Sequence, residues 1–346
     1  MRELSDEENQ SRVPKIPIDL TRYWYETGPG SIVHENHLQF VDGGDSRPSS
    51  SPERTTILVK REGSTNIWHS LMEIMSLSWT LDVLQLVPVN QGSHEPLLDP
   101  ASGNRTQIVL LDDHEDGPYI ELWRLFAQMP VRRISDLSTD EPSSNIILPL
   151  SGGSNTLWQG DWEPLNCRTG ELIRTFADRV IKHYDVPQPE CQEVITVTYI
   201  KRTGARRLLN EDDHIAHLKE ALPHAVVEVV QFEQLTFEQQ LETVRRTDVL
   251  VGVHGAGLTH ALFLRPGSAI VEVLPEGFKH QGFRNTAQLM GHDYVRTHAS
   301  RQPDSVDRDD RWQMEAVQIS KAKLTEAVEI GVKGLYSSCR RSYDAS

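Results

Sequence analysis

The second half of the chain alternates short β-branched apolar runs with helical patterns, and this alternation constrains the fold more than any other feature. Strands are predicted at 194–200, 226–232, 248–253 and 269–274, and helices at 211–221, 236–247, 258–264 and 284–290. Consecutive βα units of this length predict an α/β fold whose parallel sheet carries helices on both faces. Ligands of such sheets bind at the carboxyl ends of the strands, so functional residues are expected just after them.

The first half shows a less regular version of the same pattern. Strands are predicted at 55–59, 107–111 and 146–150, and helices at 66–86 and 119–129. A chain of 346 residues has room for about two domains. We therefore expect an irregular segment over 1–55, an N-terminal α/β domain over 56–185, a C-terminal α/β domain over 190–300, and a polar loop with a closing helix over 301–346. Asn210 is expected to cap the helix at 211–221.

Composition excludes some classes of protein. Fifty Asp and Glu against 35 Lys and Arg give a formal charge of −15, which disfavours a nucleic-acid partner because phosphate binding needs a basic surface. No run of 18 apolar residues occurs, so no transmembrane segment is expected in this chain. Residues 1–10 are acidic and polar, the reverse of a secretory signal. Three cysteines without C-x-x-C spacing predict no zinc site and leave the redox compartment open.

A glycine-rich turn follows the strand at 248–253. Its sequence over 252–260 is Gly-Val-His-Gly-Ala-Gly-Leu-Thr-His. Glycines let the backbone approach a ligand, and the first turn of the following helix offers N–H groups that suit a diphosphate. His254, Gly255, Ala256 and Gly257 are therefore candidate diphosphate ligands; the alternative is a tight βα turn without a ligand. The spacing is not the dinucleotide fingerprint, and the chain has no P-loop motif.

Two further candidate features are a basic run that follows the strand at 194–200 and an acid within the strand at 269–274. Arg202 and Arg206 belong to a run of four cations over 201–207, which suits bidentate binding of a diphosphate or else forms a solvated charge run. Glu272 lies inside an apolar strand, where a buried carboxylate needs a partner. A ribose diol is one such partner, and an internal arginine or backbone amides are the alternative. The three features are expected to converge on one nucleotide.

Taken together, these motifs resemble glycosyltransferase family 61. The resemblance covers about 60–300 and rests on the block over 252–260 with Val271-Glu272-Val273, on the basic segment over 202–210, and on Asn66-Ile67-Trp68-His69. The motifs occur in the family's order. One departure concerns the acid four residues after the motif histidine, which is usually Asp in the family and is Glu73 here.

The resemblance implies a GT-B-like fold of two Rossmann-like domains facing a cleft. It implies an inverting transferase that moves a sugar, GlcNAc or xylose, from a UDP-sugar to a hydroxyl of a protein or glycan acceptor. The C-terminal domain would hold the donor and the N-terminal domain the acceptor, in the lumen of the ER or Golgi. Arg202, Arg206 and the amides of 254–257 would stabilise the leaving diphosphate, so neither a cofactor nor a metal is expected.

Inverting transfer needs a base for the acceptor hydroxyl. His69 and Glu73 lie one helical turn apart and share a face, which favours His69 as the base, oriented or assisted by Glu73. The alternative is that His69 caps the helix and Glu73 is solvated. Asn66, Trp158 and Asp161 are assigned to the acceptor side, since sugars stack on aromatic rings and bind carboxylates; core packing of Trp158 is the alternative.

Other interpretations remain open at this point. The acidic segment 112–116 follows a strand and is either a metal site or an acidic rim, whereas Asp307-Arg308-Asp309-Asp310 is interpreted as solvated surface. The glycine turn with Glu272 is also compatible with a dinucleotide-dependent oxidoreductase. A third hypothesis is a catalytically inactive protein that binds a sugar nucleotide.

Overall fold

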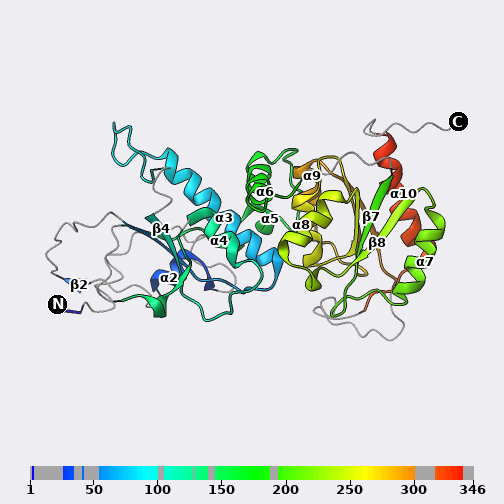
Figure 1. Cartoon of the computed structure of the whole chain (residues 1–346), viewed down its shortest axis with the longest axis horizontal. Helices are drawn as coiled ribbons and strands as arrows, with labels where there is room; N and C mark the ends of the chain where they lie inside the picture. Colours follow the sequence, from blue (N-terminus) through cyan, green and yellow to red (C-terminus); the bar gives the residue numbers. More distant parts are fainter. Residues whose placement is uncertain are drawn as a thin grey trace. The chain divides into compact units, whose positions relative to one another are not determined.

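A computed structural model of the protein describes residues 2–3, 26–34, 41–42, 54–99, 105–127, 129–138, 145–187, 194–300 and 316–337. The chain divides into two compact units, Met1–Gln159 (unit 1) and Gly160–Ser346 (unit 2). Both contain parallel sheets with helices, as the sequence predicts (Figure 1). Most of 1–55, the run 307–310, Cys191 and Cys339 lie outside the described residues.

Unit 1 is built on a four-stranded parallel sheet. Its strands are β3 (Thr55–Val59), β4 (Thr106–Leu110), β5 (Arg132–Arg133) and β6 (Asn145–Ile147), in the order β5-β4-β3-β6. All three pairings are parallel. Residues of β3 and β4 are buried throughout, which explains why they read as continuous apolar runs. The chain thus places β4 and β5 on one side of β3 and β6 on the other.

Helices and turns complete unit 1. They are α2 (Pro29–His34), α3 (Ile67–Leu86), α4 (Ile120–Ala127), α5 (Thr156–Gln159) and the 3₁₀ turns η4 (Ile134–Asp136) and η5 (Gly152–Ser154). A two-stranded antiparallel sheet pairs β1 (Arg2–Glu3) with β2 (Val41–Asp42). The turn η5 packs against α3, and α4 packs against both α3 and β4. The loop after β6 is therefore held against the helix that follows β3.

Unit 2 contains a five-stranded parallel sheet. Its strands are β7 (Ile195–Ile200), β8 (Ala225–Val230), β9 (Val249–Val253), β10 (Ala269–Leu274) and β11 (Asp293–His298), in the order β11-β10-β9-β7-β8. The first four match the predicted strands within two residues at each end. The edge strand β11 escapes sequence prediction because its residues Asp-Tyr-Val-Arg-Thr-His are mostly polar and only partly buried.

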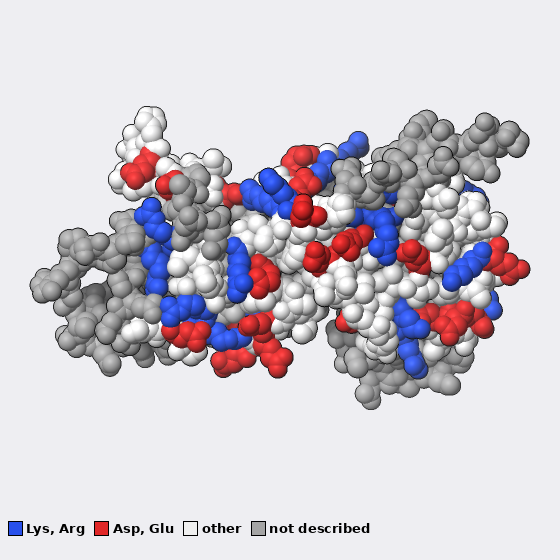
Figure 2. Space-filling view, in the orientation of Figure 1, with Lys and Arg blue, Asp and Glu red and all other residues white. Residues whose placement is uncertain are grey.

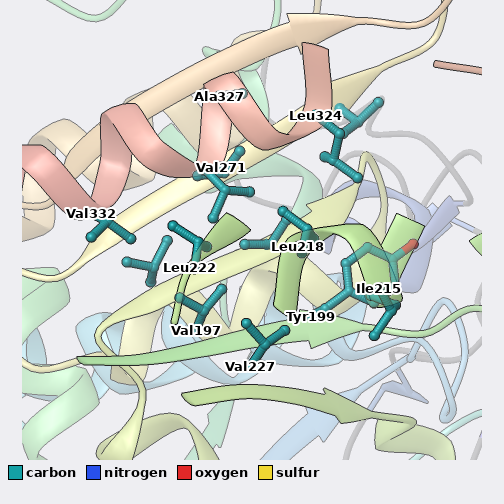
Figure 3. Close-up of a cluster of buried hydrophobic side chains, with 14 of the residues drawn as sticks. Val197, Tyr199, Ile215, Leu218, Leu222, Val227, Val271, Leu324, Ala327 and Val332 are labelled. Atoms are coloured by element: carbon teal, nitrogen blue, oxygen red, sulfur yellow. The ribbon is translucent and has the colours of Figure 1, made fainter. Parts of the chain in front are cut away.

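Helices cover both faces of this sheet. They are α6 (Glu171–His183), α7 (Glu211–Ala221), η6 (Phe232–Gln234), α8 (Phe237–Arg246), η7 (Ala256–Phe263), α9 (Gly282–Met290) and α10 (Lys321–Ser337). Figure 1 shows α7 and α10 on one side of β7 and β8, with α8 and α9 on the other. Figure 3 shows side chains of α7 and α10 meeting those of the strands, among them Leu218, Val271 and Leu324. Alternate residues of β9 and β10 face the opposite helices.

The structure corrects several details of the sequence prediction. Asn210 precedes α7 but makes no side-chain cap, because its backbone is left-handed at φ 54°. The strand expected over 146–150 ends at Ile147, and the helix expected over 258–264 is the 3₁₀ helix η7. A helix, α6, lies within the range 56–185 that the sequence analysis gives to the N-terminal domain, where no helix is predicted after 129.

Hydrogen bonds to Asn285 explain why the segment that follows Gln159 belongs to unit 2. Asn285 of α9 is fully buried, and its side-chain amide donates to the carbonyls of Gly160 and Glu163, both at 2.8 Å. Its side-chain oxygen accepts from the amide of Leu165. The segment after Gln159 is therefore tied to α9, whereas the sequence analysis assigns residues up to 185 to the N-terminal domain.

Among the described residues, the helices are too short or too polar to span a bilayer. On the face drawn in Figure 2, Lys and Arg lie interspersed with Asp and Glu over both units. No single sign of charge dominates the described part of this face.

Helix capping in unit 2 gives a first prediction. Thr236 and Gln239 form a capping box at the start of α8, with Thr236 Oγ1 accepting from the Gln239 amide at 3.3 Å. Thr236→Ala should lower the free energy of unfolding by about 1 kcal/mol, measured by urea unfolding. Asn210→Gly should stay within about 0.5 kcal/mol of wild type, because Asn210 makes no cap and glycine tolerates its left-handed backbone. A larger loss for Asn210→Gly would contradict this assignment.

Candidate functional site

In each unit, the strand order changes direction at one place in the sheet. In unit 2 this place lies between β7 and β9, and in unit 1 it lies between β3 and β6. Loops that follow the two strands at such a switch point diverge, which leaves a crevice where ligands of α/β sheets bind. The arginine loop follows β7 and the glycine turn follows β9. The predicted arginine loop and glycine turn of unit 2 therefore lie at its switch point, whereas Glu272 lies in the neighbouring strand β10.

The arginine loop and the glycine turn are in direct contact. Gly255 has a φ of 151°, and a Cβ on it would collide with Nη1 of Arg202 and lie 3.1 Å from Nη2 of Arg206. Only glycine fits here without displacing a guanidinium group. Arg206 itself has a left-handed backbone at φ 57°. The two motifs are thus in contact, while their convergence with Glu272 on one nucleotide stays a prediction.

Two half-buried guanidinium groups lie beside each other at this point. Burial lowers the pKa of both arginines, and the neighbouring charge of Arg202 helps to lower that of Arg206 to about 10. Both stay cationic at neutral pH. Arg202 Nε donates to the carbonyl of Ala205, which orients its outer nitrogens. Such a pair of like charges is stabilised when an anion binds between or beside them.

His254 connects the glycine turn to Glu272. Its Nδ1 lies 2.6 Å from Oε1 of Glu272, and the hydroxyl of Tyr294 donates to the other carboxylate oxygen at 2.5 Å. Burial lowers the pKa of His254, an effect that the hydrogen bond and charge of Glu272 oppose. Glu272 is 1% exposed. The internal partners of this carboxylate are His254 and Tyr294, rather than an arginine or backbone amides; a contact with ribose stays a prediction.

Ala256 and Gly257 form the first residues of η7, directly after Gly255. N–H groups in the first turn of a helix have no partner within it, which suits an anion. The second histidine of the motif, His260, is structural. It stacks on Phe232 at 3.9 Å, and its Nε2 lies 2.8 Å from Oε1 of Gln240. Burial lowers its pKa to about 4, so the ring is neutral.

Aromatic residues that the sequence analysis missed surround His254. The ring centroids of Phe278 and His280 lie 4.8 and 4.6 Å from that of His254. Trp162, which is 58% exposed, contacts both of these rings edge-on. Asp161 pairs with Nε2 of His280 at 3.2 Å, so this predicted acceptor-side residue lies in unit 2. Phe278 and His280 could have been found from their position, since residues 275–281 directly follow the strand that carries Glu272.

In unit 1, the loop after β3 meets the start of α3. Nδ1 of His69 pairs with Oε1 of Glu62, and the Glu62 amide donates to Oε1 of Glu73 at 2.7 Å. Asn66 caps α3 by accepting from the Trp68 amide at 3.0 Å, so His69 is not the cap. Glu62 thus contacts both Glu73 and His69. It is absent from the sequence candidates because no helical spacing relates it to His69.

Glu73 is buried and not solvated as the alternative interpretation has it. Burial raises its pKa well above 4.5, and the charges of Glu62 and Asp112 add to this, while the Glu62 amide and Arg61 oppose it. Its Oε2 has no hydrogen-bond partner among the described residues, and neither has Oγ of Ser151. Both residues line a small pocket at the ends of β3 and β6. A Cβ on Gly152 would lie 2.7 Å from Glu73 Cγ, so η5 packs directly on this carboxyl group.

Two acids of the segment 112–116 form ion pairs with arginines. Asp112 forms a buried ion pair with Arg61 at 2.8 Å, and Asp116 pairs with Arg133 at 2.8 Å. Arg61 also donates to the carbonyl of His114 at 2.8 Å. Within the part of the chain that the structure describes, no group of three or more His, Cys, Asp or Glu side chains is arranged to hold a metal ion.

Trp158 completes the surroundings of His69. Its ring meets that of His69 edge-on, with centroids 4.7 Å apart. Trp158 is half-buried, whereas Asn66 is exposed at the end of α3. The structure thus brings His69, Glu73, Asn66 and Trp158 together in unit 1, and Arg202, Arg206, His254–Gly257, Glu272 and Asp161 together in unit 2.

Comparison with known proteins identifies the family. The family description Glycosyltransferase 61 matches residues 68–271, which is more than half of the chain. The chain belongs to glycosyltransferase family 61. This confirms the resemblance drawn from the motifs. The matched range includes both His69 and the glycine turn.

Curated family 61 proteins are among the similar sequences. The EGF domain-specific O-linked N-acetylglucosamine transferase of Drosophila melanogaster is 32% identical over 229 residues, covering 63% of this chain and 40% of that protein. The Xenopus laevis protein of the same name is 35% identical over 134 residues, covering 38% and 25%. The chain therefore spans less than half the length of these relatives.

Solved structures also show partial similarity. The E. coli ADP-heptose lps heptosyltransferase II gives a TM-score of 0.36 at 11% identity, over 82% of this chain and 99% of that chain. A glycosyl transferase family 9 protein from Veillonella parvula gives 0.32 at 11% identity, over 82% and 97%.

The buried carboxyl group of this family 61 chain gives a second prediction. In Glu73→Gln, the side-chain amide oxygen can still accept from the Glu62 amide, but the side chain no longer titrates. Above pH 4.5 the unfolded wild type releases this proton while the folded protein retains it, so wild type should lose stability relative to Glu73→Gln as pH rises, by at most about 1.4 kcal/mol per pH unit. Urea unfolding of both proteins between pH 5 and 8 checks this. A difference that does not change with pH would contradict a raised pKa.

Proposed function

We propose that this chain catalyses inverting transfer of a sugar from a UDP-sugar to a hydroxyl group of a protein or glycan acceptor. The observation that carries the proposal is the contact of Arg202 and Arg206 with Gly255 at the switch point of unit 2. Two cations, a glycine turn and the first turn of η7 form a site suited to a diphosphate. Membership in family 61 supports a sugar nucleotide as the source of that diphosphate.

The donor site stabilises the charge that develops as UDP leaves. When the bond between the anomeric carbon and the diphosphate oxygen breaks, the electron pair stays on the diphosphate. Arg202, Arg206 and the amides of 256–257 are preorganised to stabilise this charge, and such electrostatic stabilisation is a large part of catalysis. This arrangement needs no metal ion, and metal-independent transfer is part of the proposal.

The acceptor is activated in unit 1. As the acceptor oxygen forms its bond to the anomeric carbon, its proton passes to His69, which acts as general base. Trp158 beside His69 suits the face of a sugar or peptide group. The proposal includes a GT-B-like organisation, in which the donor site of unit 2 and the base of unit 1 face one cleft.

The relatives suggest the substrates. Their name describes O-linked N-acetylglucosamine transfer specific for EGF domains. We therefore assign UDP-GlcNAc as the first donor to test, with UDP-xylose second, and an EGF domain as the first acceptor.

A direct assay tests the proposed function. The purified chain is titrated with UDP, UDP-GlcNAc, UDP-xylose and NADH by calorimetry, and transfer to an EGF domain is followed by mass spectrometry. Binding of UDP and a sugar-sized mass increase on the acceptor support the proposal. Binding of NADH without a response to UDP would favour the oxidoreductase hypothesis, and binding of UDP without any transfer would favour an inactive binding protein.

The arginine loop gives a third prediction. Arg206→Ala should weaken UDP binding by about 1.5–3 kcal/mol, roughly 10- to 150-fold in Kd, because it removes a charged hydrogen bond to the diphosphate. Arg207→Ala is the matched control, since Arg207 is exposed in the same loop and carries the same charge. Calorimetry measures both. Equal affinities of the two variants would remove Arg206 from the donor site.

The glycine turn gives a fourth prediction. Gly255→Ala should displace the Arg202 guanidinium and weaken UDP binding at least about tenfold, as expected for loss of one charged contact. Gly204→Ala is the control, because a Cβ there meets nothing within 4 Å. A thermal melt of each variant confirms that it is folded, and calorimetric titration of the folded variant with UDP measures its affinity. Wild-type affinity in Gly255→Ala would show that Arg202 does not contact the diphosphate.

A further inference from the structure

Glu62 contacts His69 directly, and nothing in the motif pattern pointed to it. We propose that Glu62 positions His69 for catalysis, holding the Nδ1 proton of the ring so that Nε2 accepts the proton of the acceptor hydroxyl. This inference rests on the proposed function, because it assigns a role within the same reaction. Glu62 is a positioning residue, since it acts through His69.

The backbone around Glu62 is fixed by two buried acids. The Glu62 amide donates to Glu73 at 2.7 Å, and the adjacent Arg61 amide donates to Asp112 at 2.8 Å. The Arg61 guanidinium pairs with the same Asp112, and both side chains are at most 6% exposed. Consecutive amides of the loop after β3 are therefore held from two directions. The carboxylate of Glu62 is also 6% exposed, which limits its rotamers and directs it at His69.

The ring of His69 is fixed at the same time. His69 lies in the first turn of α3, whose start is set by the Asn66 cap. Glu62 meets it at Nδ1, and Trp158 packs edge-on at 4.7 Å. Its side chain is nevertheless 23% exposed, so part of it is accessible from solvent. An accessible ring with a buried carboxylate beside one of its nitrogens is the arrangement that a general base needs.

The chemistry follows from what a carboxylate can do. An ionised carboxylate only accepts hydrogen bonds, so it selects the tautomer with the proton on Nδ1 and the lone pair on Nε2. When Nε2 takes the proton of the acceptor hydroxyl, the imidazolium forms beside the negative charge of Glu62. Glu73 does not supply this charge, because burial raises its pKa and favours its neutral form. Its role is to hold the amide of Glu62.

The experiment compares carboxylate-to-amide changes in unit 1. Glu62→Gln keeps the size of the side chain but loses the charge, and should lower kcat about 10²-fold while KM for the donor changes less than about threefold. Glu62→Asp keeps the charge and should retain more activity than Glu62→Gln. Glu121→Gln is the control, because Glu121 lies exposed on α4 and pairs with Arg124, and it should leave kcat unchanged.

A spectroscopic readout separates this inference from the proposed function. In the full chain with ¹⁵N-labelled histidine, the signal of His69 is assigned by its loss in His69→Gln. Wild type should show the neutral ring protonated on Nδ1, and Glu62→Gln should show a mixture of tautomers, since an amide both donates and accepts. No transfer by wild type would overturn the proposed function. An unchanged tautomer or unchanged kcat in Glu62→Gln would overturn the role of Glu62.

Discussion

The order in which the strands pair decides where chemistry can occur in both units. In unit 2 the chain places β8 on one side of β7 and returns to place β9 on the other, so the loops after β7 and β9 leave toward opposite faces. The side chains of both loops line the crevice between them, so a binding site can form there without a cavity in the apolar core. In unit 1, β3 and β6 create the same situation, and the loops that follow them meet at Glu73. Residues far apart in sequence come together because of this single constraint.

Each site combines groups that are unfavourable alone. Arg202 and Arg206 hold like charges close together, and Glu73 is a carboxyl group kept from water. Such arrangements cost free energy in the unliganded protein, which the apolar core of each unit has to offset. The benefit is that the groups are oriented before a ligand arrives, so little free energy is spent on ordering them during binding.

Much of the fold was predictable because buried strands read as apolar runs, as in β7, β9 and β10. The sequence analysis did not predict α6, although its residues follow an amphipathic pattern. The proximity of the arginine loop to the glycine turn was predictable because each directly follows a strand of one sheet. Tyr294, His280 and Glu62 were not, since their contacts depend on which way a side chain points across neighbouring elements. Asn210 illustrates a further limit: its residue type favours a cap, but its backbone conformation prevents one.

The close approach of Gly255 to the arginine loop has a consequence for the sequences of homologous proteins. A side chain at position 255 and a guanidinium group at position 202 cannot occupy the same volume. Among natural homologues, a larger residue at the position of Gly255 should therefore be accompanied by a shorter or differently directed residue at the position of Arg202. The two positions should covary, and lineages that have changed both should differ in how the loops after β7 and β9 meet.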